Sequence, residues 1–140
     1  MRRLLFSMAA VAAVAISSCG PACDWIEETA YAGDTSGGGS AWWYALDASS
    51  SGVYPIYAGQ EEVLGSSVTY NAGSDEITLN FGSDLQLQNV DEPVKVEGFE
   101  VLPESRPAAG QFELYKGSDL VIQGNGSNFY VIHLDVEVCK

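Results

Sequence analysis

A histidine and two acidic residues alternate near the end of the chain, at His133, Asp135 and Glu137. In a strand these side chains share one face, at about 6–7 Å from neighbour to neighbour. A neutral imidazole between carboxylates can bind a divalent metal or act as a general base. Zinc sites use three or four protein ligands, however, and the chain has a single histidine. A solvated strand face is therefore expected here, and no cofactor is predicted.

Carboxylates are plentiful, with 19 Asp and Glu against six Lys and Arg. Acidic residues follow flexible pairs at Asp75, Asp84 and Asp119, but none of these segments has the spacing of a calcium-binding loop. Asp and Ser are ordinary turn formers, so turns are expected at these positions. Two carboxylates from distant strands that meet at about 5–10 Å would suit glycoside hydrolysis, which keeps a glycan-directed hydrolase as the alternative function. No catalytic residue is singled out.

Aromatic residues are concentrated early in the chain, where all three tryptophans lie before residue 44. Trp42 and Trp43 are adjacent, so in a strand they point to opposite faces, and one is exposed unless both faces are covered. Exposed rings on a sheet can stack on sugars or anchor a protein partner. The sequence therefore predicts a binding surface formed by Trp42, Trp43, Tyr44 and Tyr57. The alternative is a core in which Trp42 is inside and Trp43 lies under a loop.

Short strands are the elements expected to position these side chains. Apolar residues occupy every second position near the end of the chain, which is the period of a half-buried strand. Similar runs recur at intervals near ten residues, each bounded by turn-forming residues, and no amphipathic helix pattern follows residue 18. Strands are predicted at 41–47, 53–57, 61–70, 77–81, 85–88, 94–101, 112–114, 120–122 and 127–139.

These strands predict an all-β domain, an antiparallel β-sandwich of the immunoglobulin-like or jelly-roll-like type, with a small barrel as the alternative. Pro55 cannot donate to a ladder and so places its strand at an edge, and Gly98 marks a β-bulge. Residues 24–32 fit a helical turn or a strand. A Gly- and Ser-rich loop follows at 33–40.

The first 18 residues have the pattern of an export signal. Arg2 and Arg3 precede an uncharged run that ends at Ile16, which is shorter than the roughly 20 apolar residues that span a bilayer. The following Ile16-Ser17-Ser18-Cys19 resembles the lipobox of bacterial lipoproteins. That resemblance implies that the cysteine is acylated and becomes the new N-terminus. The alternative is ordinary cleavage after Ser17.

The number of cysteines favours acylation. Ordinary cleavage leaves Cys19, Cys23 and Cys139, an odd set for an oxidising compartment. Acylation of Cys19 leaves the other two as a pair that brackets nearly the whole mature chain. We therefore predict a disulfide between Cys23 and Cys139. A local Cys19–Cys23 bridge with Cys139 free is the alternative.

The expected mature chain is strongly acidic. Removal of residues 1–18 leaves four cationic side chains against 19 carboxylates, a net charge of −15. Such a surface repels nucleic acid and anionic headgroups, so nucleic acid is not an expected partner and the acyl chains alone would hold the protein to a membrane. The predicted organisation is a signal peptide at 1–18, a lipidated N-terminus with the leading segment and the loop at 19–40, and the β domain at 41–140, on which 23–32 packs.

Three segments resemble a group of all-β modules in secreted and surface proteins of bacteria. Glu28-Thr29-Ala30-Tyr31-Ala32, just after Cys23, is similar to an ETAFA-like start, and Ile56-Tyr57-Ala58-Gly59-Gln60 to an IYAGQ-like middle strand. The segment from Tyr130 to Cys139 is similar to a YVVAHAxVC-like end, with larger residues at 134–138. The resemblance spans the mature chain and implies an extracytoplasmic location and paired terminal cysteines. It implies no activity.

Together these features predict a lipid-anchored, extracytoplasmic binding or structural module of the bacterial cell envelope. The expected partners are the membrane, through the lipid, and a glycan or an envelope protein. Gly20 stands where an aspartate would signal retention at the inner membrane. The outer membrane or the cell surface is therefore the expected location, with a secreted soluble protein as the alternative.

Overall fold

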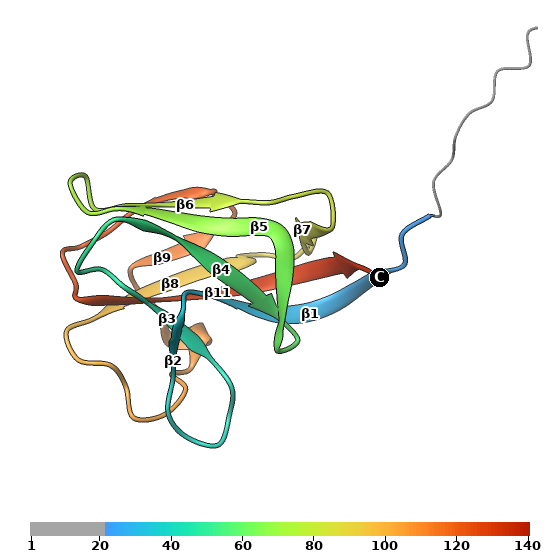
Figure 1. Ribbon diagram of the computed structural model, residues 1–140. Helices are drawn as coiled ribbons and strands as arrows, with labels where there is room; N and C mark the ends of the chain where they lie inside the picture. Colours follow the sequence, from blue (N-terminus) through green and yellow to red (C-terminus); the bar gives the residue numbers. More distant parts are fainter. Residues whose placement is uncertain (1–21) are drawn as a thin grey trace, which may run out of the picture.

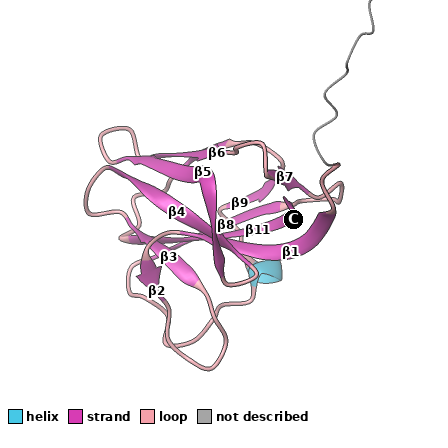
Figure 2. Ribbon diagram, turned by 45° about the vertical axis from the view of Figure 1, so that its right-hand side comes forward, coloured by secondary structure: helices cyan, strands magenta, loops and turns pink. Residues whose placement is uncertain are grey.

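The computed structural model describes residues 22–140, so the predicted signal peptide and Cys19 lie outside the described residues. The described chain is built from strands, with a single turn of 3-10 helix at Ala109–Gln111 (Figure 2). Every strand pair is antiparallel, which confirms the predicted all-β, antiparallel fold. The strands are β1 Trp25–Ala32, β2 Thr35–Ser36, β3 Tyr44–Asp47, β4 Gly52–Ala58, β5 Glu61–Asn71, β6 Glu76–Asn80, β7 Leu85–Leu87, β8 Val94–Phe99, β9 Tyr115–Gly117, β10 Val121–Gln123 and β11 Phe129–Cys139.

Strand β11 is the centre of the sheet. One of its edges pairs with β1 from Ile132 to Cys139 and with β3 at Phe129 and Tyr130. Its other edge pairs with β8 up to Leu134 and with β7 beyond it. The even-numbered side chains of β11 are buried in the main core, whereas the odd-numbered ones point to the opposite face. This is the alternation that the sequence predicts.

The sheet is one continuous path that curves around its own core. The strands run in the order β10-β6-β5-β4-β1-β11, and β8 and β9 follow beyond β11. In Figure 1, β5 and β6 lie in an upper layer and β8 and β11 in a lower one. Side chains from both layers meet in the main core, and full burial of each large aliphatic side chain contributes about 1.5–3 kcal/mol. The largest fully buried members are Leu46, Ile56, Val68, Ile77, Val94, Val96, Tyr130, Ile132, Leu134 and Val136.

The path stays open between β9 and β10, which are its two outermost strands. These strands are consecutive in the chain and are joined only by residues 118–120. So short a connection keeps Gly117 and Val121 within about 14 Å of each other. We call this opening between the two three-residue strands the seam.

A smaller core covers the opposite face of β1 and β11, which we call the outer face. Its buried members are Tyr31, Trp43, Ala45, Phe112 and Val131. The cover comes from two mostly irregular segments, which we call the covering loops: 33–43, which includes β2, and 100–114, which includes the 3-10 turn. These loops touch, because a Cβ added to Gly38 would lie 2.7 Å from the carbonyl oxygen of Glu104. Phe112, predicted in a strand, lies in this cover, and the nearest strand begins only at Tyr115.

Two predictions about single residues are wrong. The pairing of β8 with β11 runs without a register shift through Gly98, so no bulge occurs there. Pro55 is not on an edge strand, because β4 lies between β1 and β5. Pairing with β1 begins only at Ile56, and the register of β4 with β5 shifts between Pro55 and Tyr57. The missing N–H of Pro55 is therefore placed where the ladder is already interrupted.

The leading segment is an interior strand. β1 pairs with β11 over its full length and with β4 at its end, so residues 25–32 belong inside the domain instead of packing onto a domain that starts at residue 41. The small side chains of Ala30 and Ala32 face the main core, where both are fully buried. The strand predicted at 41–47 begins only at Tyr44, because Trp42 and Trp43 turn into the smaller core.

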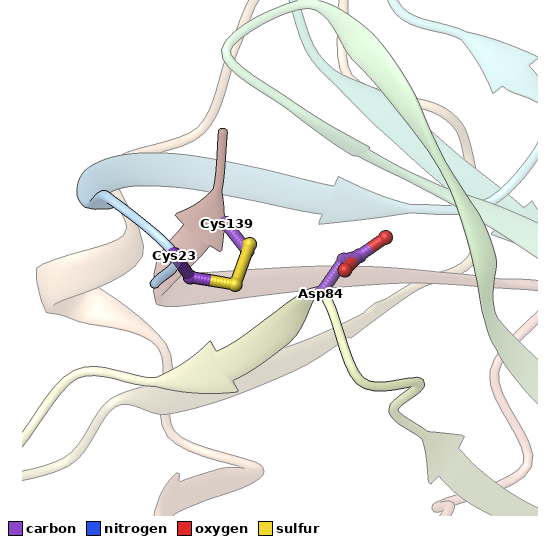
Figure 3. A group of neighbouring side chains, drawn as sticks. All are labelled: Cys23, Asp84 and Cys139. Carbon is purple, nitrogen blue, oxygen red and sulfur yellow. A yellow bond between two sulfur atoms is a disulfide. The ribbon is translucent and has the colours of Figure 1, made fainter. Parts of the chain in front are cut away.

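The Cys23–Cys139 disulfide is confirmed, and it joins positions 116 residues apart with a Cα–Cα distance of 5.0 Å (Figure 3). Beside it, the backbone N–H of Lys140 donates to the carbonyl of Asp24 at 3.0 Å, and the N–H of Asp24 donates to the carbonyl of Lys140 at 3.3 Å. We call this end of the β1–β11 pair the cystine pole. The start of β1 and the end of β11 are therefore fixed side by side.

Reduction of the disulfide is expected to lower the free energy of unfolding by about 2–5 kcal/mol, because a cross-link over so long a loop restricts the unfolded chain. Urea unfolding of the soluble domain from Gly20, with and without reductant, measures this. The Cys23→Ser, Cys139→Ser double variant is the control, since its midpoint should be low and insensitive to reductant. Equal midpoints for oxidised and reduced wild type would contradict the expectation.

Candidate binding site

The register of the sheet aligns side chains from four strands on the outer face. Tyr57 of β4, Tyr31 of β1 and His133 of β11 are direct cross-strand neighbours, and Lys95 of β8 continues the line beyond His133. Directly opposed residues in antiparallel strands point to the same side of the sheet, so these side chains lie next to one another. The line runs beside the two covering loops.

Ring contacts add two neighbours to this line in two groups, which the cross-strand pair Tyr31 and Tyr57 joins. Tyr31 meets Trp42 edge to face at 5.3 Å between ring centroids, and it meets His133 in the same way at 5.3 Å. Tyr44 stacks on Tyr57 at 4.1 Å with an interplanar angle of 13°. Each such contact contributes about 0.5–1.5 kcal/mol and sets the orientation of the rings. We call Tyr31, Trp42, Tyr44, Tyr57 and His133 the aromatic row; Tyr31 is buried, and the other four are partly exposed.

Trp43 does not belong to this surface, so the expectation that it contacts a ligand is wrong. It is only 1% exposed, and its Nε1 donates to the carbonyl of Gly38 at 2.7 Å. Its ring lies against Gly37, where a Cβ would overlap it. Trp43 therefore lies under a loop, as the alternative predicts, whereas Trp42 is partly exposed and is not inside the core as that alternative also predicts. The structure groups Trp42, Tyr44 and Tyr57 and adds Tyr31 and His133, which sequence reasoning did not place with them.

His133 is the polar centre of the aromatic row. Its Nδ1 is buried and has no hydrogen-bond partner among residues 22–140. Burial holds the pKa of His133 below its ordinary value of 6.5; the Asp135 carboxylate acts against this, whereas Lys95 and Arg106 add to it. The imidazole is therefore neutral at pH 7. It offers an uncharged polar ring between aromatic neighbours.

Cationic side chains gather beside the aromatic row, although the chain is strongly acidic. The Lys95 Nζ lies 3.2 Å from the Asp135 Oδ2, and Lys116 is the cross-strand neighbour of Lys95. The positive charge of Arg106 helps to lower the pKa of His133, and it also acts on Tyr31, whose pKa burial nevertheless raises above its ordinary value. It forms no ion pair within the described part of the chain. An unpaired guanidinium beside aromatic rings is suited to an acidic or hydroxyl-rich ligand.

The structure does not assemble a metal site from His133, Asp135 and Glu137. Asp135 pairs with Lys95, and Glu137 accepts a hydrogen bond from the amide of Gln86 at 3.0 Å. Among the described residues, the one group of three metal-type ligands is Cys23, Asp84 and Cys139 (Figure 3). Its two sulfur atoms are bonded to each other, so neither is a thiolate that could bind a metal.

Asp75 forms a polar cluster away from the outer face. Its Oδ1 accepts hydrogen bonds from the hydroxyls of Tyr70 and Tyr130, both at 2.7 Å, and its Oδ2 accepts one from the N–H of Gly126 at 2.7 Å. Burial favours the protonated carboxyl, but the three hydrogen bonds outweigh it, so the pKa of Asp75 lies below its ordinary value. Burial and the bond to Asp75 raise the pKa of Tyr70. Asp75 is thus a fixed anion that ties the β5–β6 turn to the loop before β11.

No family model matches the chain, and neither a curated protein nor a solved structure matches it. The resemblances to the lipobox and to all-β surface modules therefore stay predictions from the residues quoted for them. Among residues 22–140, no helix has the length and apolar character needed to cross a membrane.

The single histidine makes the electrostatics of the aromatic row directly measurable. We expect its Cε1 proton to titrate in NMR spectra with a midpoint below 6.5, and we expect Arg106→Gln to raise that midpoint by removing a nearby positive charge. Lys140→Gln, at the cystine pole, is the control and should leave it unchanged. A wild-type midpoint at or above 6.5 would show that burial does not control this group.

The same shift makes stability depend on pH. Because the pKa of His133 is lower in the folded chain, the unfolded chain binds more protons just below pH 6.5. The contribution of neutral His133 to the free energy of unfolding is therefore fully present above pH 6.5. It is lost as the pH falls through the pKa that His133 has in the folded chain. His133→Gln should flatten this part of the stability profile in urea unfolding.

Proposed function

We propose that this protein is a lipid-anchored binding module of the bacterial cell envelope, built on a β-sandwich, and that it holds a glycan against the aromatic row. The observation that carries the proposal is the aromatic row itself. It places four partly exposed rings together, three of them on the interior strands β3, β4 and β11 and the fourth, Trp42, on the loop before β3. Beside them lies a guanidinium that has no partner among the described residues. The two layers around the main core support the sandwich.

The site has the properties that carbohydrate recognition requires. Aromatic rings provide large, flat apolar areas for the C–H faces of sugars. Because ring contacts and strand pairing already fix these rings, little conformational entropy is lost when a ligand binds. Arg106 adds donors in a geometry that matches a carboxylate. The ligand class that fits best is therefore a glycan with acidic sugars.

The disulfide supports a location outside the cytoplasm, since disulfides persist in oxidising compartments. Acylation at Cys19 provides the anchor, and the outer membrane or the cell surface is the proposed location. The alternative of a glycan-directed hydrolase would need a carboxyl group with a raised pKa in a cleft. The pKa of Asp75 is shifted the other way, and the cross-strand neighbours Glu27 and Glu137 lie on an open sheet surface. We therefore favour binding.

Anchoring is tested with the full chain in a bacterial host. Cys19→Ser should move the protein from the membrane fraction to the soluble fraction, because it removes the acylated residue. Cys23→Ser is the matched control: it also removes a cysteine but leaves Cys19, and should stay in the membrane fraction. An unchanged membrane fraction for Cys19→Ser would refute the anchor.

Ligand binding is tested with the soluble domain on an array of neutral and acidic glycans, followed by calorimetry. Trp42→Ala should weaken binding by about tenfold or more, because an aromatic anchor typically contributes about 2 kcal/mol. Arg106→Gln should weaken binding of acidic glycans more than that of neutral ones. Trp25→Ala, at the cystine pole, is the control for loss of a tryptophan. Wild-type affinity in Trp42→Ala, or no glycan bound at all, would refute the proposal.

A further inference from the structure

We infer that the cystine pole docks on a phospholipid surface, with Trp25, Ile26 and Leu64 entering its interfacial region. This inference rests on the acylation of Cys19 in the proposed function. Docking adds that one defined end of the folded domain contacts the lipid, and this contact sets the position of the aromatic row relative to the membrane.

Exposed apolar side chains gather at this pole. Trp25 is 39% exposed, Ile26 41% and Leu64 79%. Trp25 is the cross-strand neighbour of Cys139 and Ile26 that of Val138, so the end of β1 presents one apolar side chain on each face of the sheet. Leu64 borders a hollow that Val138, Cys139 and Lys140 also line. Three large apolar groups from two strands are thus exposed at the end of the β1–β11 pair that carries the disulfide.

The chain between the acylated residue and the disulfide is short. Cys19 and Cys23 are four residues apart, so even fully extended chain spans only about 14 Å between them. If β1 separated from the sheet, the connection to the lipid would become longer. The disulfide prevents this, because it bonds Cys23 to the end of β11. The cystine pole therefore cannot move further from the lipid than this short tether allows.

Because the tether is short, weak contacts between the cystine pole and the lipid are enough for docking. The acyl chains supply the attachment, and docking becomes an intramolecular step at high effective concentration. An indole ring has an apolar body and a polar N–H, and tryptophan is accordingly enriched at membrane interfaces. Asp24, Glu27, Glu61 and Glu62 are exposed around the pole and repel anionic headgroups. The surface that fits is therefore zwitterionic.

Docking at this pole orients the rest of the molecule. β1 leads away from the lipid, and Tyr31 lies six residues beyond Trp25. At about 3.3 Å per residue, the aromatic row is held roughly 20 Å further out. In Figure 1 the end of β11, marked C, lies at the right, whereas the loop between β2 and β3 that carries Trp42 lies at the lower left. The aromatic row would then be held at a distance from the membrane that carries it.

Tryptophan fluorescence of the acylated protein tests the docking, using vesicles of phosphatidylcholine brominated in its acyl chains. Trp43 is buried and Trp42 is in the aromatic row, so Trp25 is the indole that the bromines should reach. We expect lipid quenching in the wild type, loss of that quenching in Trp25→Phe, and its retention in the matched Trp42→Phe variant. Adding phosphatidylglycerol at low salt should weaken the quenching, and raising the salt should restore it.

The outcomes separate the two proposals. If the acylated protein floats with the vesicles but wild type and Trp25→Phe are quenched equally, docking is wrong and the anchor stands. If mass spectrometry of protein extracted from membranes finds no acyl group on Cys19, the anchor is wrong and docking falls with it. Quenching that is unchanged by phosphatidylglycerol would overturn the zwitterionic preference.

Discussion

Pairing along both edges of β11 is the constraint on which the rest of the structure depends. The strand has neighbours on each side over nearly its whole length, so its backbone groups are satisfied and its register is set by four partners. A shift of one residue would exchange its two faces and move Ile132, Leu134 and Val136 out of the main core. The apolar alternation and the pairing therefore support each other. The disulfide adds a covalent stop at the end of the strand.

The same pairing places the two faces of β11 in different environments. Its even-numbered side chains fill the main core, and its odd-numbered ones form part of the outer face. There the register places His133 beside Tyr31, and Tyr31 beside Tyr57. The geometry of the aromatic row is thus a consequence of the hydrogen-bond ladder. Loops contribute only Trp42 and Arg106, which approach from the two segments that cover this face.

The sequence predicts the parts of this fold that repeat a local pattern. The apolar alternation within residues 127–139 indicates β11, and the number of cysteines indicates the pair Cys23 and Cys139. It leaves β1 undecided, because Trp25 and Ile26 are exposed at one end of that strand and small alanines are buried at the other. Gly98 appears as a bulge in the residue pattern, yet the ladder passes through it unchanged.

The candidate site was less predictable, because it depends on contacts between distant segments. Trp42 and Trp43 read as a strand pair with opposite faces, but the strand starts only at Tyr44 and both rings turn toward the smaller core. The residue pattern predicts that His133 belongs to an acidic strand face, and its contact with Tyr31 follows from a register that no local pattern encodes. The register of β1 against β11 is the information that identifies this contact, since it aligns Tyr31 with His133.

The seam between β9 and β10 bears on how these molecules behave when they are crowded together. Unpaired strand edges are the usual starting points for aggregation, because they can recruit a strand from another chain. Both edges here are only three residues long, and Lys116 is the middle residue of β9. Short, charged edges are poor templates for such growth. Crowded copies of this domain can therefore keep an open sheet without polymerising through it.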